Sequence, residues 1–353
     1  MRYQRPLQTV LFIFLALLIG SFIILLFKVS PLAGIASLFS TGFGGYTQLG
    51  ESLVISTPLL IMGVGLSIPF SAKFWNIGGQ GQYILGAIFS TWIGLVLAGS
   101  LPPFLLIIVS LAFGFVGGAI WAIPPTLMKL YLGTSEIITT LMMNFLAVFL
   151  LNFLVLGPME GPGAKAFHVP SSAPLPKSDM FPGILPGTSL TLAFVLALLF
   201  AGLLYVVLNR TRFGYEIRLI GQSQDAAKYS GVRINRNILF AMAVSGGLAG
   251  VAGMVQVFGF QGVLVPQVFS DITTSFGYVG IPVALIAALN PVSIIVSSIF
   301  FAGILNGAYG MELAYGVPVD VVIAIYGLIM LFALLGLSVN LGGFYGALKR
   351  RLR

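Results

Sequence analysis

The stretch QTVLFIFLALLIGSFIILLF, residues 8–27, decides the fold class of this chain. It contains no charged side chain, and a helix of about twenty apolar residues spans the hydrocarbon core of a bilayer. The other residues have the same character, since the chain of 353 residues is 58% hydrophobic and only 7% charged. A soluble domain is about one quarter charged. We therefore predict an all-α polytopic membrane protein.

Ten apolar runs of this kind predict about ten transmembrane helices. Their predicted ranges are 8–27, 52–70, 77–98, 103–124, 136–156, 188–208, 237–258, 275–289, 291–310 and 318–338. A secretory signal peptide also carries an apolar run, but the first run is too long for a usual signal peptide and the rest of the chain is also embedded. We expect one transmembrane domain covering 1–353.

The basic residues predict the orientation of the chain. They gather before the first run, after the last one and in the segment 209–236. The members of these groups are Arg2, Arg5, Arg210, Arg212, Arg218, Lys228, Arg233, Arg236, Lys349, Arg350, Arg351 and Arg353. With ten spans all three groups lie on one side, which the positive-inside rule makes cytoplasmic. Both termini are therefore predicted to be cytoplasmic, and topology accounts for the net charge of +8 without nucleic acid.

The segment 157–187 is predicted to be an extracytoplasmic loop, because its proline and glycine content disfavours a long helix. It is either a lid or docking surface, or a connector. The chain has no cysteine and one histidine, so thiolate sites and multi-histidine metal sites are excluded. We expect His168, which lies in this loop, to be a surface residue.

The segment 209–236 is unusually polar for this chain. Within it, SQDAAKYSG suits a short helix that Ser223 caps, that Asp225 supports through the helix dipole and that Gly231 ends. A loop that only sets topology would explain the cations. It would not explain the arrangement of the other side chains, namely Gly214, Tyr215, Glu216, Asp225, Ala226, Ala227 and Tyr229.

The stretch FGYEIRLIGQSQDAAKYSGV resembles the coupling segment of ABC-transporter permeases of the branched-chain amino acid and ribose group. The family pattern G-x-x-x-R-x-x-G-x-x-x-x-A-A-x-x-x-G maps onto Gly214, Arg218, Gly221, Ala226, Ala227 and Gly231. The resemblance implies a cytoplasmic ATPase-coupling segment over 209–236, in which a short helix sits in a cleft of the ATPase subunit. It implies coupling residues Gly214, Glu216, Arg218, Gly221, Asp225, Ala226, Ala227, Tyr229 and Gly231.

A second stretch, STPLLIMGVGLSIPFSAKFWNIGGQGQYILGA, is similar to the nucleoside branch of these permeases, which pairs with basic-membrane-protein lipoproteins. LMKLYLGTSEIITTLMMNFLAVFLLNFLVLGPM fits the same branch. Members commonly read F-N-I-G-x-E-G-Q where this chain has WNIGGQGQ. Gln80 thus stands where glutamate is usual, which removes a charge.

Buried polar groups in a membrane usually face the bundle interior, so NIGGQGQ is a candidate part of a translocation path. Its members are Asn76, Gly78, Gly79, Gln80, Gly81 and Gln82. The segment is either a broken helix inside the membrane or a cytoplasmic turn before an ordinary helix. QGVLVPQVFSDITTSFGYVGIPVAL has a similar character, which suggests a weak two-half pseudo-repeat.

Two further candidates lie on the helix predicted for 136–156. Glu136 and Asn144 share one face with Thr140 between them, and that face either lines a path or bonds neighbouring helices. Trp75, Tyr83 and Phe74 are candidates either for stacking on a nucleobase or for anchoring at the membrane interface.

The resemblance implies the permease subunit of an ATP-driven importer of nucleosides, with purine nucleosides favoured, then simple sugars such as ribose, then branched-chain amino acids. No Gly-x-x-x-x-Gly-Lys-Ser/Thr stretch is present, so we expect no bound cofactor here and ATP-Mg on a separate ATPase subunit. We expect a second, related permease subunit and a substrate-binding lipoprotein as partners, in a bacterial-type cytoplasmic membrane.

Two rivals remain. An ion-gradient-driven secondary transporter would need paired intramembrane carboxylates, and only Glu51, Glu136, Glu312 and Asp320 are available. An intramembrane enzyme would need a clustered nucleophile and base or a metal set.

Overall fold

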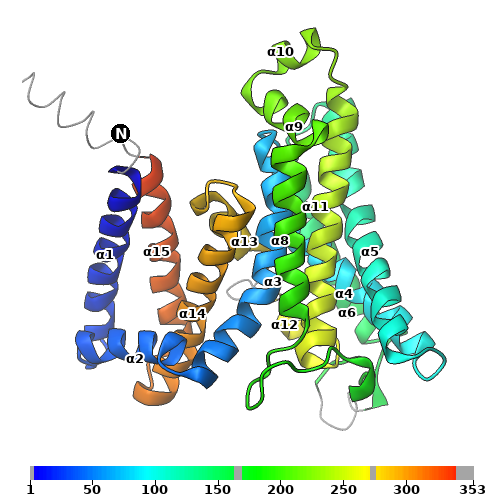
Figure 1. Ribbon diagram of the computed structural model, residues 1–353. Helices are drawn as coiled ribbons and strands as arrows, with labels where there is room; N and C mark the ends of the chain where they lie inside the picture. The colour runs from blue at the N-terminus through cyan, green and yellow to red at the C-terminus, as the bar shows by residue number, and fades with distance from the viewer. Residues whose placement is uncertain (1–3, 163–168, 271–275, 339–353) are drawn as a thin grey trace, which may run out of the picture. The chain divides into compact units, whose positions relative to one another are not determined.

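The computed structural model describes residues 4–162, 169–270 and 276–338, and these residues are largely helical (Figure 1). In chain order the elements are α1 (Gln4–Leu25), α2 (Pro31–Phe43), α3 (Tyr46–Ser71), α4 (Gly79–Leu97), α5 (Pro103–Leu132), α6 (Glu136–Val155), η1 (Lys177–Asp179), α8 (Ala193–Arg210), α9 (Arg212–Gln222), α10 (Gln224–Tyr229), α11 (Ile234–Gln256), the π-helical turn η2 (Val257–Gln261), α12 (Pro266–Ser270), α13 (Phe276–Ile286), α14 (Pro291–Tyr315) and α15 (Val319–Ser338). The prediction of an all-α polytopic membrane protein is confirmed.

The prediction of about ten spans agrees with the eight long apolar helices and the shorter apolar helices of the described residues. Within the described ranges, eight helices are long and apolar enough to cross a membrane: α3, α4, α5, α6, α8, α11 with η2, α14 and α15. The runs predicted at 8–27 and 275–289 form apolar helices with shorter described apolar stretches, Leu11–Leu25 and Phe276–Ile286. The 13-residue helix α2 was not predicted at all. A helix of that length rises only about 20 Å and does not span a bilayer by itself.

Several boundaries also differ from the predicted ones. α5 continues past residue 124 through Pro124 and Pro125 to Leu132, because inside a bundle neighbouring groups can satisfy the backbone that proline leaves unpaired. α8 begins at Ala193 rather than 188. His168 and the cations after 338 lie outside the described residues.

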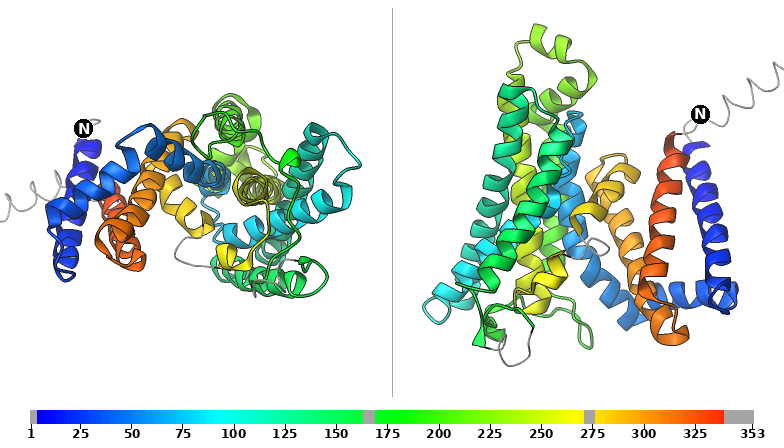
Figure 2. Two further views of the ribbon diagram at one scale, coloured as in Figure 1. Left: turned by 90° about the horizontal axis from the view of Figure 1, so that it is seen from below. Right: turned by 180° about the vertical axis from the view of Figure 1, so that it is seen from behind.

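The chain divides into two compact units, residues 49–302 and residues 1–48 with 303–353. In the second of these, the described parts of α1 and α15 lie side by side (Figures 1 and 2). The later part of α14 packs on α2, where a Cβ on Gly307 would lie 2.1 Å from the Leu38 carbonyl oxygen. Asn306 donates to the carbonyl oxygen of Thr41 at 3.2 Å.

The unit 49–302 is built around close packing of α4, α5 and α11. Gly86 of α4 and Gly114 and Gly118 of α5 lie against Gly250 of α11, and a Cβ on Gly250 would come within 2.1 Å of the Gly114 carbonyl oxygen. Small residues allow such approach, which drives helix association in lipid through van der Waals contact. The stretches GFVGG, residues 114–118 of α5, and GGLAG, residues 246–250 of α11, therefore face each other.

A non-helical segment, residues 72–78, separates α3 from α4 inside this unit. Ser71, the last residue of α3, lies beside Gly221 of α9, whereas Asn76 already bonds Ser245 in the middle of α11. Ser245 is eleven residues after the beginning of α11, which corresponds to about 16 Å of helix rise. Residues 72–78 thus return into the bundle and α4 begins there, so the segment is an interior break and not a surface turn.

The segment 209–236 and the loop 157–187 lie at opposite ends of α11 (Figure 1). Glu216 of α9 contacts Asn237 near the beginning of α11. At the other end, the backbone amides of Phe181 and Leu175 donate to the carbonyl oxygens of Phe258 and Gly262. The 21 residues from Asn237 to Phe258 correspond to about 32 Å of helix, close to the thickness of a hydrocarbon core.

Candidate functional site

The interior break is held by a buried network of amide side chains. Asn76 and Gln82 form a reciprocal pair, with Asn76 Nδ2 donating to Gln82 Oε1 at 2.9 Å and Gln82 Nε2 donating to Asn76 Oδ1 at 3.0 Å. Asn76 Nδ2 also reaches Ser245 Oγ at 3.2 Å. Both amides are almost fully buried, and buried amides are stable only when they are bonded in this way.

Helix α6 supports the same break from the side. Asn144 Oδ1 accepts from the Gly81 amide at 2.8 Å, and Asn144 Nδ2 donates to the Ile77 carbonyl oxygen at 2.9 Å. The Ile77 amide donates to Thr140 Oγ1 at 3.3 Å. This face of α6 was expected either to line a path or to bond neighbouring helices. The contacts of Thr140 and Asn144 agree with bonding to neighbouring segments.

Gln80 connects the break to α12 and α13 in the other half of the unit. Its Nε2 donates to the Phe269 carbonyl oxygen at 2.7 Å, and its Oε1 accepts from the Gly277 amide at 2.9 Å. α12 ends just after Phe269 and α13 begins at Phe276. The beginnings of α4 and α13 therefore meet at Gln80, inside the bundle, as in the paired half-helices of transporter repeats.

The segment 209–236, predicted to couple to an ATPase, contains two helices, α9 and α10. The predicted caps of α10 are present: Ser223 Oγ accepts from the Ala226 amide at 3.2 Å, and Gly231 adopts a left-handed φ of 71° after the helix. Of the predicted coupling residues, Gly214, Gly221 and Ala227 are buried. Asp225, Ala226 and Tyr229 are exposed, Tyr229 to 94%.

The buried members attach the segment to the bundle. A Cβ on Gly221 would lie 2.1 Å from the Ser71 carbonyl oxygen, and one on Gly214 would lie 2.2 Å from that of Leu208. Arg218 donates to the Leu208 carbonyl oxygen. The half-buried Glu216 accepts from Arg212 Nε at 2.6 Å and from Asn237 Nδ2 at 2.7 Å. We call Arg212, Glu216 and Asn237 the Glu216 clasp, and its hydrogen bonds from Arg212 and then Asn237 lower the pKa of Glu216.

Residues 48–334 match the family model described as branched-chain amino acid transport system / permease component. This match covers most of the chain. The chain belongs to this permease family. It is therefore a multi-pass protein of the cytoplasmic membrane and the permease subunit of an ABC importer of small polar solutes.

Individual relatives cover nearly the whole permease. It is 29% identical over 332 residues to the guanosine ABC transporter permease protein NupP of Bacillus subtilis, covering 94% of this chain and 93% of the relative. It is 31% identical over 342 residues to the glucose ABC transporter permease protein TsgB13 of Haloferax volcanii, covering 94% and 86%. It is 28% identical over 333 residues to the nucleoside ABC transporter permease protein NupB of Lactococcus lactis, covering 93% and 89%.

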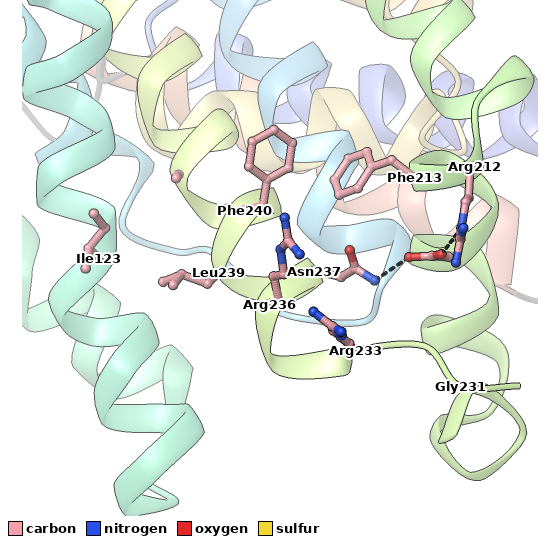
Figure 3. A pocket seen from close by; sticks show the side chains of 11 residues that line it. Ile123, Arg212, Phe213, Gly231, Arg233, Arg236, Asn237, Leu239 and Phe240 are labelled. Atoms are coloured by element: carbon pink, nitrogen blue, oxygen red, sulfur yellow. Dashed lines mark hydrogen bonds and ion pairs between the residues drawn. The ribbon is translucent and has the colours of Figure 1, made fainter. Parts of the chain in front are cut away.

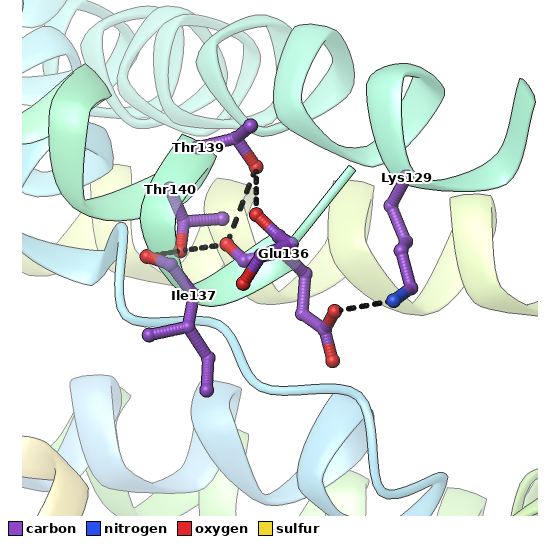
Figure 4. Close-up of polar contacts among 6 residues, drawn as sticks. Lys129, Glu136, Ile137, Thr139 and Thr140 are labelled. Carbon is purple, nitrogen blue, oxygen red and sulfur yellow. Dashed lines mark hydrogen bonds and ion pairs between the residues drawn. The ribbon is translucent and has the colours of Figure 1, made fainter. Parts of the chain in front are cut away.

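Glu136 does not join the amide network of the permease. Its carboxylate pairs with Lys129 Nζ at 2.8 Å, which links the end of α5 to the beginning of α6 (Figure 4). Thr140 lies one turn later and donates to the backbone carbonyl oxygen of Glu136 at 2.6 Å. Glu136 thus lies at a helix junction, two turns from Asn144.

One group of aromatic side chains was not predicted as a unit. Tyr83 of α4 lies 5.0 Å from Phe269 and 6.2 Å from Phe276, measured between ring centroids. Its hydroxyl is buried and has no hydrogen-bond partner among the described residues. The sequence contained the signal only for Tyr83, because the two phenylalanines come from the other half of the permease.

Proposed function

We propose that the permease imports nucleosides, with purine nucleosides favoured. The observation that carries this proposal is the similarity to guanosine and nucleoside permeases over 93–94% of the chain. The rings of Tyr83, Phe269 and Phe276 would stack on the nucleobase once the path opens, since Tyr83 and Phe269 are buried in this structure and aromatic rings stack on any nucleobase. Asn76, Gly78, Gly79, Gln80, Gly81, Gln82 and Asn144 would then shape the path beside these rings. Glu136 lies off it.

A simple sugar is the second candidate cargo. The glucose permease of Haloferax volcanii is as similar to this chain as the nucleoside permeases are. A sugar would use the amides of the break as donors and acceptors, but those amides are already bonded to one another. Branched-chain amino acids are the third candidate.

The cargo is tested by uptake into vesicles that hold the assembled transporter. We expect guanosine to be taken up and to be displaced by other purine nucleosides, whereas glucose in tenfold excess leaves the rate unchanged. Uptake of labelled glucose that guanosine does not inhibit would instead favour the sugar.

We further propose that a separate ATPase subunit holds ATP-Mg and docks on α10. The exposed side chains there are Asp225, Ala226 and Tyr229, on a helix that projects beyond the bundle (Figure 1). A second, related permease subunit would complete the path. A substrate-binding lipoprotein would deliver the cargo on the side of the 157–187 loop.

The docking proposal needs variants that change exposed positions only. Substituting Gly221 or Ala227 would disturb the packing of the segment itself, because both are buried. We therefore combine Ala226→Glu with Tyr229→Ala. The expected result is loss of the ATPase on co-purification and at least a tenfold fall in ATP-driven uptake, with the permease still folded.

The matched control is Tyr46→Ala, which removes another exposed tyrosine, 58% accessible, at the beginning of α3. It should retain both ATPase and uptake. Uptake that continues without ATP and ignores the α10 variants would favour a gradient-driven carrier.

A further inference from the structure

A cavity of about 880 Å³ lies beside the Glu216 clasp, between α5, α9 and α11 (Figure 3). We call it the arginine pocket. Its walls combine three arginines with apolar side chains. The lining side chains include Ile123, Arg212, Phe213, Arg233, Arg236, Leu239 and Phe240.

One face of α11 supplies most of the pocket. Arg233, Arg236 and Phe240 are spaced three and four residues apart, so they follow one another along the same side of the helix. Both arginines are exposed at the start of the helix, and Phe240 is 55% exposed one turn further into the membrane-spanning stretch. This face therefore passes from cationic to apolar where α11 enters the bilayer.

The charge of the pocket is unbalanced. Glu216 is the acidic residue of the lining, and its carboxylate already accepts from Arg212 and Asn237. Arg233 and Arg236 have no carboxylate partner in the part of the chain that the structure describes. Two guanidinium groups are thus available to an anion.

A second cavity of about 530 Å³ shares Arg233, Arg236 and Leu239 with the first. It adds Lys228 from α10 and Tyr131 from the end of α5, and Tyr131 is 74% exposed. The two arginines therefore stand between two hollows, each of which has a cationic and an apolar side. Tyrosines with an apolar ring and a polar tip are typical of the membrane interface.

We propose that the arginine pocket binds the headgroup of an anionic phospholipid. Guanidinium groups bind phosphate oxygens in pairs of parallel hydrogen bonds, and an acyl chain would follow Leu239 and Phe240 into the bilayer. A basic pocket between spans on the cytoplasmic side is the usual setting for such a headgroup. A water-soluble anion would pair with the arginines but would leave the exposed ring of Phe240 uncovered.

Because the pocket adjoins α9, a bound lipid would affect how firmly α9 is attached to α11. Arg212 belongs both to the pocket and to the Glu216 clasp, which holds α9 on α11. A phosphate between Arg212, Arg233 and Arg236 would reduce their mutual repulsion and hold α9 against α11. An anionic lipid would thereby stabilise the segment proposed to receive the ATPase.

The test is lipid retention by the purified permease, measured by native mass spectrometry after exposure to equal amounts of phosphatidylglycerol and phosphatidylcholine. We expect wild type to retain phosphatidylglycerol. Arg236→Gln should lower its apparent affinity about fivefold, and Arg233→Gln with Arg236→Gln by about 25-fold, because each cation near a membrane surface contributes a factor of this size. Arg210→Gln removes an exposed cation outside the pocket, at the end of α8, and should change the affinity less than twofold.

A second measurement tests the acyl chain. In vesicles, Phe240→Trp should gain fluorescence that brominated phosphatidylglycerol quenches more strongly than brominated phosphatidylcholine, and Arg236→Gln in the same background should abolish this preference.

Three results would overturn the proposal. Equal retention by Arg236→Gln and Arg210→Gln would show general surface attraction only. Displacement of the lipid by millimolar inorganic phosphate would show an ion site. If neither brominated lipid quenches the indole introduced by Phe240→Trp, a second permease subunit or the ATPase covers the pocket instead.

Discussion

At the residue scale, the amide side chains at the interior break bond either to one another or to neighbouring backbone groups. Asn76, Gln80, Gln82 and Asn144 all have partners. Gln80 needs an amide rather than a carboxylate, since it donates to Phe269 and accepts from Gly277 at the same time. An ionised carboxylate accepts only. This gives a physical reason for glutamine at a position where the family pattern that this stretch resembles has glutamate.

Tyr83 is the exception, and its hydroxyl predicts a cargo contact. Tyr83→Phe removes a buried hydroxyl that has no partner among the described residues, so the stability of the permease should not fall. If the hydroxyl bonds the cargo, the KM for uptake should rise by about two- to tenfold with kcat retained, as expected for one hydrogen bond.

The matched control is Tyr278→Phe. That hydroxyl accepts from Asn144 Nδ2 at 3.1 Å, so its loss should lower the free energy of unfolding by about 1 kcal/mol. An unchanged KM in Tyr83→Phe would remove this tyrosine from the path.

At the element scale, the packing of α4, α5 and α11 depends on glycine. Gly250→Ala would place a methyl group 2.1 Å from the Gly114 carbonyl oxygen, so the helices must separate. We expect a loss of about 1–3 kcal/mol in the free energy of unfolding, as for other overpacked cores. Gly202→Ala on α8 is the control, because a Cβ there meets nothing within 4 Å. It should be neutral or stabilising, and equal melting temperatures for both variants would contradict this packing.

The attachment of α9 to α11 is an element-scale property that depends on pH. The hydrogen bonds from Arg212 and Asn237 hold the pKa of Glu216 below its usual range. A group whose folded-state pKa is depressed stabilises the fold above its unfolded pKa of about 4.3, and this contribution is lost as pH falls through the folded-state pKa.

Glu216→Gln therefore predicts a pH-dependent difference in hydrogen exchange. At pH 7 the α9 amides of the variant should exchange about twofold faster than those of wild type, the size expected for an exposed ion pair. Below the folded-state pKa the ratio should approach one. A ratio that stays constant with pH would show that the ionised carboxylate does not hold α9.

At the scale of the whole molecule, the segment 209–236 and the 157–187 loop should lie on opposite sides of the membrane. They contact opposite ends of α11, and the basic residues predict which end is cytoplasmic. The chain has no cysteine, so single exposed positions can be labelled directly.

We expect Ser230→Cys to react with an impermeant maleimide only in inside-out vesicles and Ser178→Cys only in right-side-out vesicles. Both serines are exposed. Labelling of both from the same side would contradict the predicted orientation of the unit 49–302.

The sequence by itself determined the class of the fold, the capped helix α10 and the membership of the permease family. These properties depend on composition and on patterns within one segment, such as the apolar runs and the Ser223 and Gly231 signals. Such local signals act wherever the segment lies in space.

Only the tertiary structure decided that the NIGGQGQ segment forms an interior break and which side chains make up the aromatic group. Asn76 bonds Ser245, 169 positions away, and Gln80 bonds Gly277, 197 positions away. In the same way, Gly221 was predicted as a coupling residue from its place in a sequence pattern, and only the structure shows that it is buried against Ser71. Hydrogen bonds and packing between distant segments depend on which helices meet, and no pattern within one segment specifies that.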